Sequence, residues 1–352
     1  MELGNVGLSL AVFDGRGKGV TANSKEDSAD MLVSNQFGIK QRISSFDLAR
    51  VNVVTSAFFL TRLYLDSEGL NRRFLVETHN SPVFGNENKS GLGSSAASSV
   101  AVVKSLFLAN ELKGRKDGEM LHKVAQYSYA AYSKKVDSGF DIATCCVGHS
   151  IEYMRFDPRE IDLPREPDSE DLEQKFLSSI NKPWPDMSSK VVPIPSRYDM
   201  LFFNIEGART STLRNLRVVA AWKKEHGPLH GELIRQQNIY ERKGIESFRR
   251  GDDEGLRHNV HGARGVQRKL QRLIATEGSG FDLIEPRPLS RLIEFGESYP
   301  GVVVGRCPGA GGWDGLAFVI DRNYLDEMPV RQMIQKARSL GLTLKPLQLR
   351  LS

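Results

Sequence analysis

The run K-S-G-L-G-S-S-A-A at residues 89–97 constrains this chain more than any other feature of its sequence. Glycines let backbone amides approach phosphate oxygens, and a following helix points its unpaired amides and positive dipole end at the same place. Ala96, Val100, Val103 and Phe107 recur at helical spacing, so we expect the run to lead into a helix. These features predict a phosphate cradle.

Three other interpretations of this run are open on its residues alone. A Walker A loop needs G-x-x-x-x-G-K-[ST], which nothing here matches. The dinucleotide fingerprint G-x-G-x-x-A fits Gly91, Gly93 and Ala96, although the polar stretch 79–90 separates them from the expected strand before it. The purely structural alternative is a start of a helix, rich in small residues, that packs closely against a sheet.

Length and composition predict an ordinary globular protein. A chain of 352 residues favours two modest domains, and 40% hydrophobic with 26% charged residues is typical of such proteins. No apolar run approaches the roughly 18 residues that a membrane helix needs, and the N-terminus has no secretory signal pattern. Cys145, Cys146 and Cys307 form neither a disulfide framework nor a metal motif. We therefore expect a cytoplasmic protein without a membrane partner.

The formal net charge of +5 indicates attraction to anions, and much of it lies between Arg235 and Arg272. Nucleic-acid binding would need a recognisable module or interleaved aromatic residues, whereas this stretch has only Tyr240 and Phe248. We expect a solvated helical face, with one or two arginines turned toward a phosphorylated ligand, and no nucleic-acid partner. The sequence does not indicate an oligomeric state.

Alternating strand and helix patterns in both halves predict an α+β or α/β protein. Expected strands lie at 6–13, 18–22, 74–78, 200–205, 302–304 and 316–320, with one more at the end of the chain. Expected helices lie at 47–65, 96–113, 119–135, 289–295 and 328–340, with further helical segments up to Ile274. Residues 157–195 hold seven prolines and little periodicity, so we expect an inserted loop or a connection between domains.

Three ordered motifs resemble those of the GHMP kinases, and most of all those of phosphomevalonate kinases. The run G-L-G-S-S-A-A at 91–97 resembles the second GHMP signature. S-G-F-D-I-A at 138–143 and P-G-A-G-G-W-D at 308–314 resemble the S-G-F-D-[VI]-A and P-G-A-G-G-[YF]-D runs of the phosphomevalonate kinases. S-G-F-D-L-I-E-P at 279–286 is similar to their S-G-x-x-I-E-P segment, and the resemblance extends from about Leu8 to Ile320.

The resemblance implies a two-domain α+β fold of the GHMP kinase type. Residues 1–190 would form an ATP-binding domain similar to ribosomal S5 domain 2, and residues 191–352 a ferredoxin-like domain. The implied reaction transfers the ATP γ-phosphoryl group to 5-phosphomevalonate with magnesium, giving 5-diphosphomevalonate and ADP. The alternatives are a GHMP kinase for another acceptor, such as mevalonate or a sugar, a non-catalytic ligand-binding relative and, more distantly, an NAD-binding enzyme.

The resemblance also implies roles for single residues. Asp141 would orient or deprotonate the acceptor, Lys89 would offset charge on the transferring group, and Ser94 would bind magnesium. The expected ATP contacts are Gly91, Leu92, Gly93, Ser94, Ser95 and Ala96. The expected substrate contacts are Ser138, Gly139, Thr210, Thr212, Gly309, Ala310, Gly311 and Gly312. Each residue also has a structural alternative: Asp141 and the threonines can cap helices, Lys89 can lie on the surface, and the glycines can form a tight turn.

Two features depart from the family pattern. Asp137 stands where members usually have glycine before S-G-F-D, and its carboxylate beside a phosphate site would weaken binding or shift selectivity. The first GHMP signature, a P-G-[KR]-x-x-[LI] strand, has no counterpart near the N-terminus. We expect the natural protein to start earlier, with this strand encoded upstream.

Overall fold

The computed structural model describes residues 31–34, 40–43, 53–70, 94–112, 115–164, 171–185, 187–206, 212–277, 284–308, 311–313, 315–327 and 330–349. Backbone contacts divide the chain into two compact units, Glu2–Val191 and Val192–Ser352. None of the helices in the described ranges is long and apolar enough to cross a membrane. The strands expected at 6–13, 18–22 and 74–78 lie outside these ranges.

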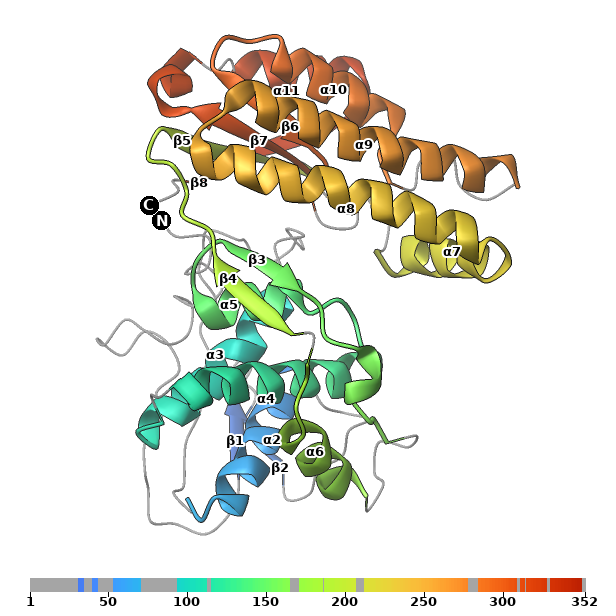
Figure 1. Ribbon diagram of the computed structural model, residues 1–352. Helices are drawn as coiled ribbons and strands as arrows, with labels where there is room; N and C mark the ends of the chain where they lie inside the picture. The colour runs from blue at the N-terminus through green and yellow to red at the C-terminus, as the bar shows by residue number, and fades with distance from the viewer. Residues whose placement is uncertain are drawn as a thin grey trace. The chain divides into compact units, whose positions relative to one another are not determined.

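The first unit is built around three helices that pack against one another, α2 (Val53–Ser67), α3 (Ser94–Ala109) and α4 (Arg115–Ser133) (Figure 1). They confirm the helices predicted near 47–65, 96–113 and 119–135. Their apolar faces meet in one core that includes the fully buried Leu60, Val103 and Tyr127. The antiparallel strands β1 (Met31–Ser34) and β2 (Lys40–Ile43) form one pair, and β3 (Ile151–Met154) and β4 (Ser188–Val191) form another.

The prediction of a loop or connection at 157–195 is wrong for much of that stretch. It contains the short helix η2 (Pro158–Glu160), the helix α6 (Leu172–Asn181) and β4. Phe176 and Ile180 of α6 are buried in the core of the first unit, and so is Trp184, whose ring lies 4.6 Å from that of Phe156. Prolines and charges around α6 concealed its four-residue apolar spacing, which is the local signal of a buried helical face.

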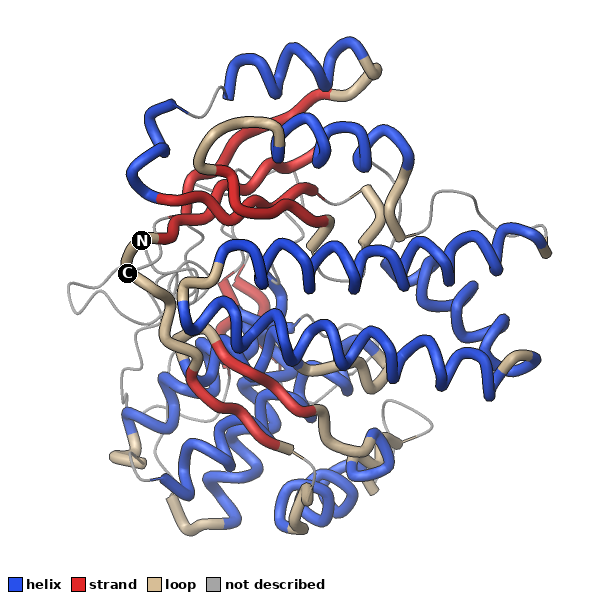
Figure 2. The backbone as a smooth tube through the Cα atoms, turned by 45° about the horizontal axis from the view of Figure 1, so that its top comes forward, coloured by secondary structure: helices blue, strands red, loops and turns tan. Residues whose placement is uncertain are grey.

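The second unit contains a four-stranded sheet, whose strands are red in Figure 2. The strands follow the order β6-β7-β5-β8, and all neighbouring strands are antiparallel. Its strands are β5 (Tyr198–Glu206), β6 (Val302–Arg306), β7 (Gly315–Asp321) and β8 (Thr343–Leu349). Its helices are α7 (Thr212–Glu225), α8 (Gly227–Arg250), α9 (Asp253–Thr276), α10 (Arg287–Glu297) and α11 (Val330–Ser339), with the short helix η3 (Arg322–Glu327). The chain order and strand order are those of a ferredoxin-like domain, as predicted.

Helices α10 and α11 bury their apolar faces against the sheet, with Leu289, Ile293 and Met333 in the same core as Phe318. The long helices α8 and α9 lie side by side (Figure 1). The end of α8 and the start of α9 pack against β5 and β6. Because β6 ends at Arg306 and β7 begins at Gly315, the glycine-rich run 308–314 is the connection between two paired strands. The sheet therefore fixes both ends of this run.

The expectation of a solvated basic face on α8 and α9 is wrong for Arg264. This side chain is buried and donates two hydrogen bonds to the buried Glu285, at 2.9 and 2.8 Å. A buried charge is tolerated only when it is paired and hydrogen-bonded, and Glu285 supplies both. Arg235 and Arg249 are exposed, as predicted.

Candidate active site

Helix α3 begins at Ser94, directly after the glycine-rich run, which confirms that the run leads into a helix. Its first turn carries no acidic residue, Ser95 is half-buried and Ala96 is fully buried. Further along, the Ser99 hydroxyl donates to the carbonyl of Ala125 at 3.2 Å, so that α3 and α4 pack closely. The start of this helix therefore suits an anionic ligand. Lys89, Gly91, Leu92, Gly93 and the side chain of Ser94 lie outside what the structure describes.

Helix α5 (Phe140–Val147) packs against α3 and α4 and carries Asp141 in its first turn. The residue before the helix is Gly139, in a left-handed conformation with φ of 75°. A Cβ atom at this position would lie 2.5 Å from Oε1 of Gln126 and 3.1 Å from the hydroxyl of Tyr153. The glycine of the S-G-F-D motif is therefore required by both its conformation and its close packing. Since Gly139 occupies the N-cap, Asp141 is not the helix cap.

The carboxyl of Asp141 is half-buried, and one of its oxygens accepts a hydrogen bond from the backbone N–H of Ile142 at 3.1 Å. Burial, and after it the negative charge of Asp137, raise the pKa of Asp141 to about 6. The Ile142 hydrogen bond and the charge of Lys135 act in the opposite direction. Asp141 thus changes charge close to neutral pH, which is common for residues of active sites.

The turn that leads into α5 is held from two sides. The guanidinium of Arg155, on the exposed side, donates to the carbonyl oxygen of Asp137 at 2.8 Å. The buried side-chain amide of Gln126, on α4, donates to the carboxylate of Asp137 at 3.4 Å. Ser138 is exposed, next to the buried Gly139. Ser138 therefore lies on a turn that is fixed to both α4 and the stretch after β3, and Asp141 follows it in the first helical turn of α5.

In the second unit, Gly311 and Gly312 lie in the β6–β7 connection with φ of 75° and 87°. The N–H of Gly312 donates to the carbonyl of Ile284 at 2.7 Å. Ile284 is held in turn by Gln271 of α9, whose side-chain oxygen accepts from the N–H groups of both Ile284 and Glu285 at 2.8 Å. The segment that carries the I-E-P motif thus supports the P-G-A-G-G-W-D run.

The predicted site residues fall into two groups, each described within its own unit. The first unit brings α3, with Ser95 and Ala96, against α5, with Asp141. The second unit holds Gly311, Gly312 and Thr212, which is the first residue of α7. Thr210, Gly309, Ala310 and the side chain of Thr212 lie outside the described part of the chain.

Sequence patterns missed the buried residues that support these loops, Gln126, Arg264, Gln271 and Glu285. Their signal is weak, because both glutamines lie on amphipathic helices that also carry many exposed polar residues. Only the packed structure shows that their polar groups are buried and bonded to a loop.

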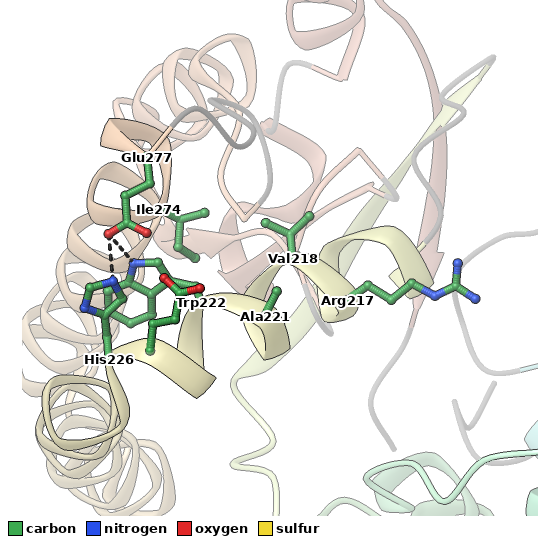
Figure 3. Close-up of a pocket in the computed structure, with 8 residues that line it drawn as sticks. Arg217, Val218, Ala221, Trp222, His226, Ile274 and Glu277 are labelled. Carbon is green, nitrogen blue, oxygen red and sulfur yellow. Dashed lines mark hydrogen bonds and ion pairs between the residues drawn. The ribbon is translucent and has the colours of Figure 1, made fainter.

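A separate pocket lies in the second unit beside α7 and α9 (Figure 3). Here Glu277 accepts a hydrogen bond from the indole N–H of Trp222 at 3.1 Å and pairs with Nε2 of His226 at 2.8 Å. Glu225 adds a third potential metal ligand, within 4.8 Å of the others. Glu277 is thus bonded to both Trp222 and His226, and no predicted site residue lines the pocket, so it is not the candidate active site.

Residues 58–149 match the family model of the GHMP kinases N terminal domain. The phosphomevalonate kinase of Candida albicans is 29% identical over 327 residues, and the match covers 82% of this chain and 73% of the relative. The phosphomevalonate kinase of Aspergillus fumigatus is 28% identical over 253 residues, covering 67% of this chain and 51% of the relative. The chain thus spans about half the length of this second relative.

Among solved structures, the phosphomevalonate kinase of Streptococcus pneumoniae in complex with phosphomevalonate and AMPPNP superposes with a TM-score of 0.63. The two are 19% identical, and the match covers 88% of this chain and 85% of that chain. At this identity the likeness shows the fold. The fold, the family model over residues 58–149 and the curated relatives agree with the three ordered motifs, and in each of these respects the chain is similar to phosphomevalonate kinases or to the wider GHMP kinases.

Proposed function

We propose that this chain transfers the γ-phosphoryl group of ATP to 5-phosphomevalonate, giving 5-diphosphomevalonate and ADP. One observation carries the proposal: α5, which presents Asp141, packs against α3, which starts directly after the glycine-rich run. A carboxylate with a raised pKa thus belongs to the same compact unit as a helix start suited to phosphate. The names of the curated relatives support phosphomevalonate as the acceptor.

In this reaction a phosphate oxygen of the acceptor attacks the γ-phosphorus, the bond to the bridging β–γ oxygen breaks, and ADP leaves. Phosphoryl transfer depends mainly on positioning and on stabilising charge. The acceptor is already an anion near neutral pH, so the main role of Asp141 would be to orient it and to accept a residual proton. Lys89 would offset the charge that develops on the transferred group.

The start of α3 would hold the phosphates of ATP. Gly91, Leu92 and Gly93 would contribute backbone amides, followed by Ser94, Ser95 and Ala96. The absence of an acidic residue in the first turn of α3 and the buried small side chain of Ala96 support this assignment. The Ser94 hydroxyl would be a ligand of Mg²⁺, which supplies positive charge to the β- and γ-phosphate oxygens when bound.

The acceptor would contact Ser138 and Gly139 in the first unit and Thr210, Thr212 and residues 309–312 in the second. The N–H groups of Gly311 and Gly312 already donate to the carbonyl oxygens of Pro308 and Ile284, so these glycines would contribute a close approach of the backbone to the acceptor, which their positive φ angles and missing side chains support. The cytoplasm is the proposed location, since three cysteines, Cys145, Cys146 and Cys307, without a disulfide framework among them fit a reducing compartment.

Phosphorus NMR tests the proposed reaction directly. The chain is incubated with ATP, Mg²⁺ and 5-phosphomevalonate, and we expect the monoester signal to be replaced by two coupled diphosphate signals as ADP forms. The Asp141→Asn variant, folded by circular dichroism, should give at least about a hundredfold slower conversion. Release of inorganic phosphate without a new diphosphate would show ATP hydrolysis and contradict the proposal.

A further inference from the structure

The turn between α4 and α5 is fixed by several independent contacts. Its ends are residues in the left-handed region, Lys134 with φ of 56° and Gly139 with φ of 75°. Arg155 donates to the carbonyl oxygens of Asp137 and Val136, at 2.8 and 3.5 Å. With its backbone held at Asp137 and tight packing at Gly139, the turn has little freedom to move when a ligand binds.

Gln126 is the buried part of this arrangement. Its side chain is completely inaccessible to solvent, its Nε2 donates to the carboxylate of Asp137, and its Oε1 lies against Gly139. Among the described residues, neither this Oε1 nor the Tyr153 hydroxyl has a hydrogen-bond partner. A buried amide that leaves its oxygen unpaired costs free energy, so its presence calls for an explanation. The group that Gln126 holds is Asp137.

The Asp137 carboxylate is thereby held in the turn directly before α5, whose first turn carries Asp141. Burial, and after it the negative charges of both carboxylates, raise the pKa of Tyr129 and of Tyr153. The elements packed against α5 present few other titratable or charged groups here. They are Lys135 in the turn, Tyr129 and Tyr132 on α4, Lys104 on α3, Tyr153 and Arg155 at β3, and the exposed Lys190 on β4.

We propose that Asp137 is a positioning residue for the reaction proposed above: clamped by Gln126 and Arg155 in the turn before α5, its carboxylate keeps a second negative charge next to the segment that carries Asp141. Like charges held close together resist simultaneous ionisation, so Asp141 loses its proton at a higher pH than it would alone. Asp141 thereby becomes a better proton acceptor near neutral pH. The expected effect on turnover rests on the proposed function. The coupling of the two carboxylates is independent of that function.

The test compares the pH dependence of kcat and the titration of the Asp141 carboxyl carbon by NMR, in the parent and in Asp137→Asn. The substitution keeps the shape and the acceptor oxygen for Gln126 while it removes the charge. We expect the acid limb of kcat and the NMR midpoint to move to lower pH together, by about one unit. The acceptor phosphate titrates in the same range but is common to all variants, so the difference reports on the protein. Glu173→Gln, on the exposed side of α6, removes a charge elsewhere in the same unit and should leave both unchanged.

A second substitution tests the clamp itself. In Gln126→Leu the Asp137 carboxylate can turn toward solvent, so the shift caused by Asp137→Asn should shrink to less than half of its value in the parent. If the NMR midpoint of Asp141 and the acid limb of kcat are unchanged in Asp137→Asn, the proposal is overturned. If Asp137→Asn shifts the NMR midpoint as much in the Gln126→Leu background as in the parent, the role of Gln126 as a clamp is overturned. If the NMR midpoint moves but phosphomevalonate is not turned over, the carboxylate coupling stands and the proposed function fails.

Discussion

The backbone N–H of Gly312 donates to the carbonyl oxygen of Ile284 at 2.7 Å, which ties the glycine-rich β6–β7 connection to the segment before α10. Ile284 is itself bonded to Gln271, and the next residue, Glu285, is paired with the buried Arg264. Two motifs that are distant in the sequence are thus parts of one arrangement. Substitution of residues that do not contact the substrate in this proposal is therefore expected to change the conformation of the β6–β7 connection.

Gly311→Ala is expected to distort that loop. A Cβ atom at Gly311 would lie 2.1 Å from the Ile284 carbonyl oxygen, in a backbone conformation that side chains disfavour. We expect kcat/KM for the acceptor to fall at least tenfold and the free energy of unfolding to fall by about 2 kcal/mol or more. Steady-state kinetics and urea unfolding measure these effects.

Gly341→Ala is the matched control, because Gly341 has the same φ of 75° but no atom within 4 Å of the added Cβ. It should cost only about 1 kcal/mol and leave kcat/KM unchanged. If Gly311→Ala and Gly341→Ala lower kcat/KM and the free energy of unfolding equally, the contact with Ile284 has no particular importance.

Glu285→Gln should destabilise the second unit strongly, because it leaves Arg264 buried with an incomplete partner. Truncating one member of a buried ion pair costs about 3 to 5 kcal/mol. Glu232→Gln removes the partner of Arg235 in an exposed pair and should cost less than about 1 kcal/mol. Urea unfolding of both variants checks the contrast, and similar small losses would contradict the importance of the Arg264–Glu285 pair.

Asp141→Asn should stabilise the protein at neutral pH while it abolishes most turnover. Because the pKa of Asp141 is raised from 3.8 to about 6, its folded-state contribution is favourable below pH 4 and is lost as pH rises through 6. Above pH 6 the buried, ionised carboxylate destabilises the folded state, and the substitution removes that charge. The free energy of unfolding should therefore rise by about 1 to 3 kcal/mol at pH 8 and change little at pH 4. Urea unfolding at the two pH values measures the difference. A variant that is less stable than the parent at pH 8 would show that the ionised carboxylate stabilises the fold.

Lys89→Met should lower kcat by about a hundredfold or more while ATP still binds, because the lysine is expected to act on the charge of the transition state. Single-turnover kinetics and titration with a fluorescent nucleotide separate the two effects. The control is Lys190→Met, which removes an exposed lysine from the same unit and should have no effect. Turnover within a few-fold of the parent would return Lys89 to an ordinary surface role.

Features with a local signal were predicted from the sequence. The helix after the glycine-rich run and the strands around 200, 302 and 316 follow from apolar spacing and flanking glycines, and the structure confirms them. Helix α5 was not predicted, since its eight residues are too few to show periodicity. Burial of polar groups could not be predicted either, because Arg264 and Gln126 have the same sequence surroundings as exposed residues and differ only in what packs against them.

The most direct test of the account is the rate of ADP release with four acceptors: 5-phosphomevalonate, mevalonate, galactose and homoserine. Each is measured with ATP and Mg²⁺, and Asp141→Asn serves as the background. We expect kcat/KM for 5-phosphomevalonate to exceed that of each other acceptor by at least about a hundredfold, because a site built for a phosphate leaves its donors unpaired with a neutral acceptor. Equal or faster turnover of mevalonate would contradict the assignment of the acceptor.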